Sequence, residues 1–267
     1  MDVSVVLVNY NTLELTSACI ESIVGHTFDL SYEILVVDNA STDGSKSFFE
    51  KDLRIKYIYV DKNLGFGKAN NLALRYAQGR NILFLNTDTV LRNNAVKTLS
   101  IFLDSNPQVG ACGGNLFNAK GDPAYSYCKW FPSIKDQVDC LFHRVFSRWL
   151  YHGSFCFNNT SKPKEVAYVT GADLMVPRKI LDECGAFDPH FFLYFEETEL
   201  CHRIKTNGYK RFSVPEAEIF HFEGSSINSA GKTKRQYYSA SREIYFSLTG
   251  RCRFYSKVVA FLATYCK

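Results

Sequence analysis

Short apolar runs alternate with amphipathic stretches over about the first 110 residues of this chain. "VSVVLVNY" at 3–10 is a near-continuous run of apolar, largely β-branched side chains, which is typical of a strand buried on both faces. Three more strand-like runs follow, "YEILVVDNA" at 32–40, "IKYIYVD" at 55–61 and "NILFLNTDT" at 81–89. The pattern therefore predicts four strands in this part of the chain.

The sequence between these runs favours helices. Apolar residues recur at helical spacing over 13–25, and Gly25 is the expected C-cap. Cap and turn residues open a short helix within 41–52, and another helix is expected over 67–79, ending at Gly79. This βαβα order predicts an α/β fold with an open, Rossmann-like, mostly parallel sheet and helices on both faces.

The second half is less regular. Residues 112–165 are rich in aromatic residues and cysteine, and their pattern predicts no layout. Residues 166–185 indicate a strand, a turn and a helix, and a further helix is expected to begin near Glu196 and to end at 207–208. The tail, 232–267, mixes Lys and Arg with aromatic residues and is expected to be helical.

Composition excludes several classes of protein. The chain has 267 residues, 46% of them hydrophobic, so it can bury a sizeable core. A net charge of +4 is too small to indicate nucleic-acid binding. The nine cysteines form no CxxC pair, which argues against zinc sites and disulfide frameworks and favours reduced thiols in a cytosolic protein. The first residues lack the features of a signal peptide, and no run reaches the ~20 apolar residues of a membrane span.

Polar clusters follow the predicted strands, where open parallel sheets bind ligands. They are Asn9-Tyr10-Asn11, Asp38-Asn39, Asn63 and Asn86-Thr87-Asp88. A carboxylate at Asp88 suits Mg²⁺ or Mn²⁺ that also binds phosphates, although a strand-end turn or helix cap explains it equally well. Asp38 can accept hydrogen bonds from a ribose or a base, and His221, which ends another strand-like run, is either structural or a metal ligand that complements Asp88.

The segment "NLGFGKAN" at 63–70 also follows a strand and opens a helix. Its spacing, G-x-G-x-x-N, lacks the third glycine of the dinucleotide fingerprint, and "VNYNT" follows the first strand instead. A Rossmann NAD site is therefore not indicated. The glycines either let the backbone approach a ligand or form a plain tight turn.

The segment "FFLYFEETEL" at 191–200 places three carboxylates behind an aromatic run. Acidic residues in a first helical turn are stabilised by ~0.3–1 kcal/mol each, and Glu199 can pair with Arg203 at i,i+4. The aromatic run implies a partly dry site, where an ionised Glu196 or Glu197 is a credible general base. Glu196 and Glu199 share a helix face, and Glu197 points ~100° away.

Taken in order, seven segments resemble glycosyltransferase family 2, the inverting, metal-dependent enzymes of the GT-A fold, especially its rhamnosyltransferase-like branch. They span residues 3 to about 226 and read "VSVVLVNYN", "ILVVDNASTDGS", "NLGFGKANN", "LFLNTDT", "VTGADLMVPRKILDECGAFD", "FFLYFEETELCHRIKTNGY" and "HFEGSS". "NTD" stands where the family has Asp-x-Asp, and "FEE" stands where it has a paired acidic motif.

The resemblance implies a role for each matching position. Glu197 would be the catalytic base, and Asp88 and His221 would hold Mn²⁺ or Mg²⁺. Acceptor binding would fall to Glu196, Trp130 and Tyr194, with Glu199 structural. The nucleotide-sugar site would comprise Val8, Tyr10, Asn11, Asp38, Asn63, Gly65, Phe66, Gly67, Asn70, Asn86 and Thr87.

We therefore expect a GT-A domain over 1–231, with a nucleotide-sugar half at 1–110 and an acceptor half at 111–231. The expected activity is inverting transfer from dTDP-rhamnose or a UDP-hexose to a saccharide hydroxyl, the acceptor being linked to a polyprenyl diphosphate, in bacterial surface polysaccharide synthesis. A sugar nucleotidyltransferase would need a glycine-rich, basic loop after the first strand, where "NYNTLEL" stands. A catalytically silent sugar-nucleotide-binding module would lack the acidic residues that this chain retains.

The tail over 232–267 leaves two interpretations open. Its basic and aromatic residues suit an anionic membrane surface, where each Lys or Arg contributes ~1 kcal/mol, which would make the chain a cytoplasmic protein peripheral to the inner face of the membrane. An ordinary C-terminal helix that packs its aromatic residues on the domain explains the same pattern.

Overall fold

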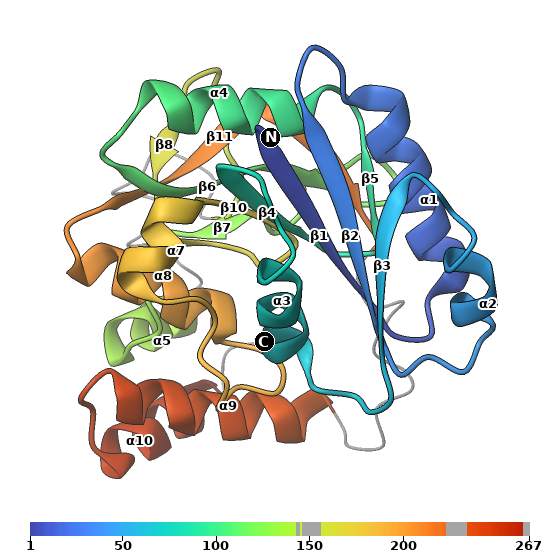
Figure 1. Ribbon diagram of the computed structural model, residues 1–267. Helices are drawn as coiled ribbons and strands as arrows, with labels where there is room; N and C mark the ends of the chain where they lie inside the picture. Colours follow the sequence, from blue (N-terminus) through green and yellow to red (C-terminus); the bar gives the residue numbers. More distant parts are fainter. Residues whose placement is uncertain (143–144, 146–155, 223–233, 264–267) are drawn as a thin grey trace.

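Nine strands form one sheet in the part of the chain that the computed structural model describes, residues 1–142, 145, 156–222 and 234–263 (Figure 1). Their order is β3-β2-β1-β4-β10-β6-β11-β5, and β8 pairs with β11. The four strands expected from the sequence lie side by side and parallel, and they are β1 (Val3–Asn9), β2 (Tyr32–Asn39), β3 (Ile55–Val60) and β4 (Asn81–Leu85). The expected α/β architecture is confirmed.

The second half of the chain completes this sheet. Strand β10 runs antiparallel to β4 and β6, whereas β11 runs parallel to β6 and antiparallel to β5. A separate ribbon pairs β7 with β9. The bounds are β5 (Thr89–Leu91), β6 (Val109–Phe117), β7 (Tyr127–Cys128), β8 (Lys164–Glu165), β9 (Tyr168–Val169), β10 (Asp173–Pro177) and β11 (Lys210–His221).

Helices cover both faces of the sheet (Figure 1). Successive side chains of β1 alternate between the faces, so Val5 packs in the core cluster beneath α1, α2 and α4, and Val6 packs in the cluster beneath α3, α7 and α8. The bounds are α1 (Leu13–His26), α2 (Ser45–Phe49), α3 (Phe66–Leu74), α4 (Ala95–Ser105), α5 (Ile134–Leu141), α7 (Arg178–Cys184), α8 (Glu196–Thr206), α9 (Lys234–Leu248) and α10 (Arg253–Ala263).

Two expected helix ends were wrong. Helix α1 runs through Gly25 to His26, and Thr27 is the C-cap. Helix α3 ends at Leu74 rather than at Gly79, because the Gly79 amide donates to Ser4 Oγ of β1 at 2.7 Å instead of continuing the helix.

The C-terminal helices α9 and α10 pack beside the segment that precedes α8 (Figure 1). Tyr245 and Phe246 of α9 are buried with Phe191 and Phe195, and Tyr237 stacks on Phe192 with ring centroids 4.9 Å apart. The expected domain boundary at 231 lies outside the described residues. None of the helices in the described ranges combines the length and the apolar character that crossing a membrane requires.

Candidate active site

A cleft of about 410 Å³ lies beyond the carboxyl ends of β1, β2 and β4. Its walls come from the loops after these strands, from the segment before α8 and from the end of β11. Most of the site residues expected from the sequence line this cleft, namely Val8, Tyr10, Asn63, Gly65, Phe66, Asn86, Thr87, Asp88, Tyr194, Glu196, Glu197 and His221.

The other expected residues lie outside its walls. Asp38 is fully buried, and its carboxylate accepts hydrogen bonds from the Ser41 amide and the Tyr57 hydroxyl at 2.8 and 2.6 Å. Asn39 lines the cleft instead, because successive strand residues point to opposite faces.

Four more expected residues are placed elsewhere. Asn11 accepts a hydrogen bond from the Thr42 amide, and Asn70 donates to the Phe66 carbonyl within its own helix. Gly67 lies in α3, and a Cβ there would face Phe187. Trp130, expected at the acceptor, lines a second cavity. The structure therefore does not bring these side chains to the cleft.

A hydrogen-bond network fixes the loop between β3 and α3. Asn39 Nδ2 donates to Asn63 Oδ1 at 2.9 Å, and the Leu64 and Gly65 amides donate to Asn39 and Asn63 in turn. Gly65 has a φ of +82°, and a Cβ there would lie 2.5 Å from the carbonyl oxygen of Phe192. Only glycine fits this close approach of two cleft walls.

Asp88, His221 and Asn86 come together in the wall of the cleft. Asp88 Oδ1 lies 3.3 Å from His221 Nε2, and Asn86 Nδ2 lies 3.5 Å from the same nitrogen. Asp88 is 3% exposed, and its Oδ1 accepts no hydrogen bond within the described chain. A buried carboxylate oxygen of this kind, with an imidazole beside it, fits a divalent cation. No group of three potential His, Cys, Asp or Glu ligands occurs among the residues described, so Asp88 and His221 are the two that this part of the chain offers here.

Glu196 and Glu197 lie together in the cleft at the start of α8. Tyr194 and Phe195 directly before them have φ values of +71° and +69°, a strained conformation that turns the chain sharply into the helix. The Glu196 carboxylate is buried, and its Oε2 has no hydrogen-bond partner within the described ranges, whereas Glu197 Oε1 accepts from Thr198 Oγ1 at 3.0 Å. Glu197 is the better solvated of the two.

The carboxyl groups of Glu196 and Glu197 differ in pKa. Burial raises the pKa of Glu197 above its ordinary value. The pKa of Glu196 rises well above its ordinary value, because of burial and then because of the negative charge of Glu197. The pair therefore loses its first proton from Glu197, and Glu196 gives up its proton at a higher pH.

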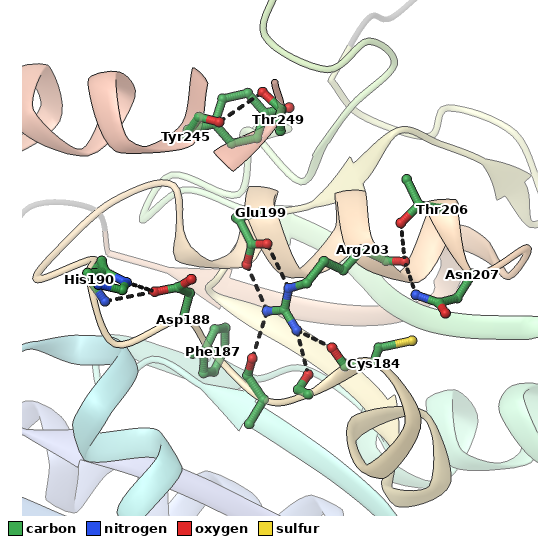
Figure 2. Close-up of polar contacts among 12 residues, drawn as sticks. Cys184, Phe187, Asp188, His190, Glu199, Arg203, Thr206, Asn207, Tyr245 and Thr249 are labelled. Carbon is green, nitrogen blue, oxygen red and sulfur yellow. Dashed lines mark hydrogen bonds and ion pairs between the residues drawn. The ribbon is translucent and has the colours of Figure 1, made fainter. Parts of the chain in front are cut away.

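Glu199 pairs with Arg203, as the i,i+4 spacing predicted (Figure 2). Both carboxylate oxygens accept from the guanidinium at 2.7 Å, and the same guanidinium donates to the backbone carbonyls of 184–186. Glu196 and Glu199 share a helix face, but their carboxylates do not lie together. Glu196 lines the cleft with Glu197, whereas Glu199 is held by Arg203. Glu199 ties α8 to the loop after α7.

Several lining residues were not singled out by the sequence. Phe192 and Leu193 belong to the aromatic run that was noticed, and Tyr125 comes from the middle segment, whose layout was not predicted. The other unforeseen lining residues are Thr170, Gly171 and Ala172, and Asn39 was noted in a polar cluster but given no role. Asp173 follows them on β10, fully buried, and burial raises its pKa to about 7.

The sequence model described as Glycosyl transferase family 2 matches residues 4–185, about two thirds of the chain. The chain belongs to glycosyltransferase family 2. It is 24% identical over 208 residues to the N-acetylglucosaminyl-diphospho-decaprenol L-rhamnosyltransferase of Mycobacterium tuberculosis, covering 72% of this glycosyltransferase and 67% of that relative. It is 29% identical over 126 residues to the putative teichuronic acid biosynthesis glycosyltransferase TuaG of Bacillus subtilis, covering 45% of this chain and 50% of TuaG.

This glycosyltransferase is also 23% identical over 231 residues to the uncharacterized protein y4gI of Sinorhizobium fredii, covering 84% of the chain and 25% of that relative. It thus spans a quarter to a half of the length of several curated relatives.

Solved structures share its fold. GalNAc-T7, crystallised with UDP, GalNAc and Mn²⁺, aligns with a TM-score of 0.66 at 16% identity, over 100% of this chain and 55% of that one. The mannosyltransferase PcManGT of Pyrobaculum calidifontis, in complex with GDP-Man and Mn²⁺, aligns with a TM-score of 0.58 at 20% identity, over 97% and 69% of the two chains. At these identities the likeness establishes the GT-A fold.

Proposed function

We propose that this protein transfers a sugar from a nucleoside-diphosphate sugar to a hydroxyl of a saccharide acceptor, with inversion at the anomeric carbon. The observation that carries the proposal is that one cleft holds both a candidate cation-binding pair, Asp88 and His221, and an acidic pair, Glu196 and Glu197. dTDP-rhamnose and UDP-hexoses are the proposed donors, in bacterial surface polysaccharide synthesis.

Asn39 and Asn63 hold the loop against which the nucleotide would lie, and Tyr10 provides an aromatic wall beside it. Asp88 and His221 would hold Mn²⁺ or Mg²⁺ next to the donor's diphosphate. A bound divalent cation supplies positive charge that stabilises the departing diphosphate. The imidazole ligand favours Mn²⁺ over Mg²⁺, because Mg²⁺ takes oxygen ligands almost exclusively.

Glu197 would take the proton of the attacking acceptor hydroxyl, and its ionisation before its neighbour supports this role. Neutral Glu196 can donate a hydrogen bond to another acceptor oxygen without repelling the anion beside it. Tyr194 and Phe192 form the wall against which a sugar ring would pack. The acceptor hydroxyl would attack one face of the anomeric carbon while the diphosphate leaves from the opposite face. This is a single displacement, which inverts the anomeric configuration.

The acceptor that we propose is a saccharide linked to a polyprenyl diphosphate, reached at the inner face of the membrane. A named relative, the mycobacterial rhamnosyltransferase, supports an acceptor of this kind. Helix α10 also keeps Phe254 73% exposed among basic residues, as a membrane-facing helix would.

The test is a thermal-shift panel of nucleoside diphosphates with and without Mn²⁺, followed by transfer assays with the sugar nucleotides that bind. A ligand at 100 times its Kd should stabilise the folded chain by about 2.7 kcal/mol. Transfer of labelled sugar to a saccharide supports the proposal. Donor binding without transfer or hydrolysis would favour the silent binding module, and absence of any nucleotide effect would refute the donor site.

A further inference from the structure

A second cavity, of about 870 Å³, lies along α8 beyond the acidic pair. It is enclosed by the start of α5, the segment around β8, the second half of α8 and the connection between α9 and α10. Among its described lining residues, one carboxylate, Glu165, faces a larger set of cations, Lys129, Lys135, Lys205, Arg211 and Arg251.

Arg211 provides a fixed charge at the base of this cavity. It is 5% exposed, and its guanidinium donates to the carbonyls of Ala167, Tyr209 and Val166, each at 2.9 Å. No carboxylate of the described chain lies within ion-pair distance of it, so its charge is oriented but not neutralised. A buried cation without a counter-ion is costly, and an anionic ligand would offset that cost.

Two further cations stand at the rim. Lys205 Nζ lies 5.4 Å from the centre of the Phe131 ring, and the Arg251 guanidinium lies 4.6 Å from that of Tyr255 and donates to its hydroxyl. Within the described ranges neither makes an ion pair. Glu165 is 3.8 Å from Lys210 Nζ, which partly neutralises it.

His202 lines the same cavity as these cations, and their charges affect the pKa of its imidazole. Its ring meets Phe131 edge-on, with centroids 5.1 Å apart. Burial lowers the pKa of His202, and the charges of Lys205, Arg251 and Arg211 lower it further. Three cations, Lys205, Arg251 and Arg211, therefore surround His202 in the same cavity.

We propose that this cavity binds a phosphate or diphosphate ester, and that during transfer it holds the phosphate end of the acceptor. Guanidinium and ammonium groups around one anion are the usual phosphate-binding set, and the aromatic walls leave an apolar surface for the group that the phosphate carries. The second half of this proposal rests on the proposed function.

The spacing along α8 fits such an acceptor. His202 and Lys205 follow Glu197 by five and eight residues, which at 1.5 Å per residue is about 8 and 12 Å. Tyr125 lines the cleft, Tyr168 packs against Phe131 in the wall of the second cavity, and their hydroxyls are 3.2 Å apart, so the two cavities are neighbours. A short saccharide that presents a hydroxyl to Glu197 can thus extend its phosphate toward the cations.

Direct binding is the first test. Calorimetric titration of the full chain in EDTA, with inorganic pyrophosphate and with a short prenyl diphosphate, measures the cavity without cation-dependent binding in the cleft. Lys205→Gln and Arg251→Gln should each weaken binding about tenfold, and Lys257→Gln, an exposed α10 residue outside the cavity, should not. Equal affinity of wild type and both cavity variants would overturn the proposal.

The two probes also separate the sources of the phosphate. Tighter binding of the prenyl diphosphate than of pyrophosphate supports a lipid-borne ester, and equal affinities support a soluble phosphate ester.

Kinetics test the acceptor role. With a saccharide diphosphate as acceptor, Lys205→Gln and Arg251→Gln should raise KM about tenfold, while KM for the donor and for the same saccharide as a methyl glycoside should not change. An equal rise for both acceptors would overturn the acceptor role. Absence of transfer to either acceptor would refute the proposed function instead, and the calorimetric result would stand independently.

Discussion

Replacing Glu197 by glutamine is expected to remove most of the turnover and to leave donor binding intact. The amide keeps the shape of the side chain and the contact with Thr198 Oγ1, but it cannot accept a proton. Loss of a general base typically lowers a rate by ~10²–10⁴, which corresponds to about 2.7–5.4 kcal/mol of transition-state stabilisation. The loss should appear in kcat rather than in the donor KM.

Glu196→Gln is the matched control, because it makes the same change one residue away. Glu196 is more deeply buried than Glu197, and the charge of Glu197 adds to burial in raising the pKa of Glu196. Over the pH range in which Glu197 alone has ionised, Glu196 is neutral, and a neutral amide mimics it. We expect a loss of less than about tenfold.

The pH dependence gives an independent check. The proposed mechanism requires Glu197 to be deprotonated, and burial raises the pKa of Glu197 above its ordinary 4.5. Log kcat should therefore fall with unit slope as the pH drops through a value above 4.5. In Glu196→Gln this acid limb should occur at the same pH, because residue 196 is uncharged in both proteins over the range in which Glu197 titrates. In Glu197→Gln the residual rate should show no such acid limb.

Single-turnover transfer of a labelled sugar, measured across the pH range in which the fold is intact by circular dichroism, gives the required rates. Donor affinity is measured separately by calorimetry. Near wild-type turnover in Glu197→Gln would refute the base assignment. A larger loss in Glu196→Gln than in Glu197→Gln would reverse it.

Three further changes test other parts of the structure. EDTA should abolish transfer, and Mn²⁺ or Mg²⁺ should restore it; full activity in the chelator would contradict a role for the cation. Calorimetry should show that Asp88→Ala weakens cation-dependent binding of a nucleoside diphosphate. Arg203→Met should lower the free energy of unfolding in urea by about 3 kcal/mol, because it leaves a buried carboxylate unpaired, whereas exposed Arg54→Met should change it by less than about 1. Gly65→Ala should weaken nucleoside diphosphate binding by about 1–3 kcal/mol, unlike Gly44→Ala, which has a similar positive φ but open space around it.

The first half of the fold could be predicted because three of its first four strands are buried on both faces. Such strands need continuous apolar runs, and β1, β2 and β4 have them. The sequence missed β6, Val109–Phe117, for a physical reason. A Cβ at Gly113 would lie 2.2 Å from Val169, and one at Gly114 would lie 2.3 Å from the Ala217 carbonyl, so close packing requires residues with low strand propensity.

The candidate site was predictable where it depends on the ends of parallel strands. Those ends meet at one edge of the sheet, so Tyr10 and Asp88 could be grouped without a structure. Strand parity was the weak point, because Asp38 faces away from the cleft and Asn39 faces it. Trp130 was misplaced because its segment carries no periodic pattern from which to orient it.

The tail divides its apolar residues between two surfaces, so the two interpretations of its sequence are compatible. Ser241 Oγ donates to the Leu193 carbonyl at 2.7 Å, and buried Tyr245 packs against Phe195, so α9 supports the turn that leads into Glu196. Phe254 and Leu248 remain 73% and 49% exposed.

Truncation of the tail would therefore remove the contacts that support the turn before Glu196 as well as any membrane-binding surface, and its effect on liposome binding could not be interpreted. Substituting serine for Phe254 and Leu248 leaves the buried contacts of α9 in place. We expect this double variant to sediment less with anionic liposomes while turnover with a soluble acceptor stays unchanged, because its exposed apolar area is the part available to lipid. Unchanged sedimentation would assign the tail to support of the active site alone.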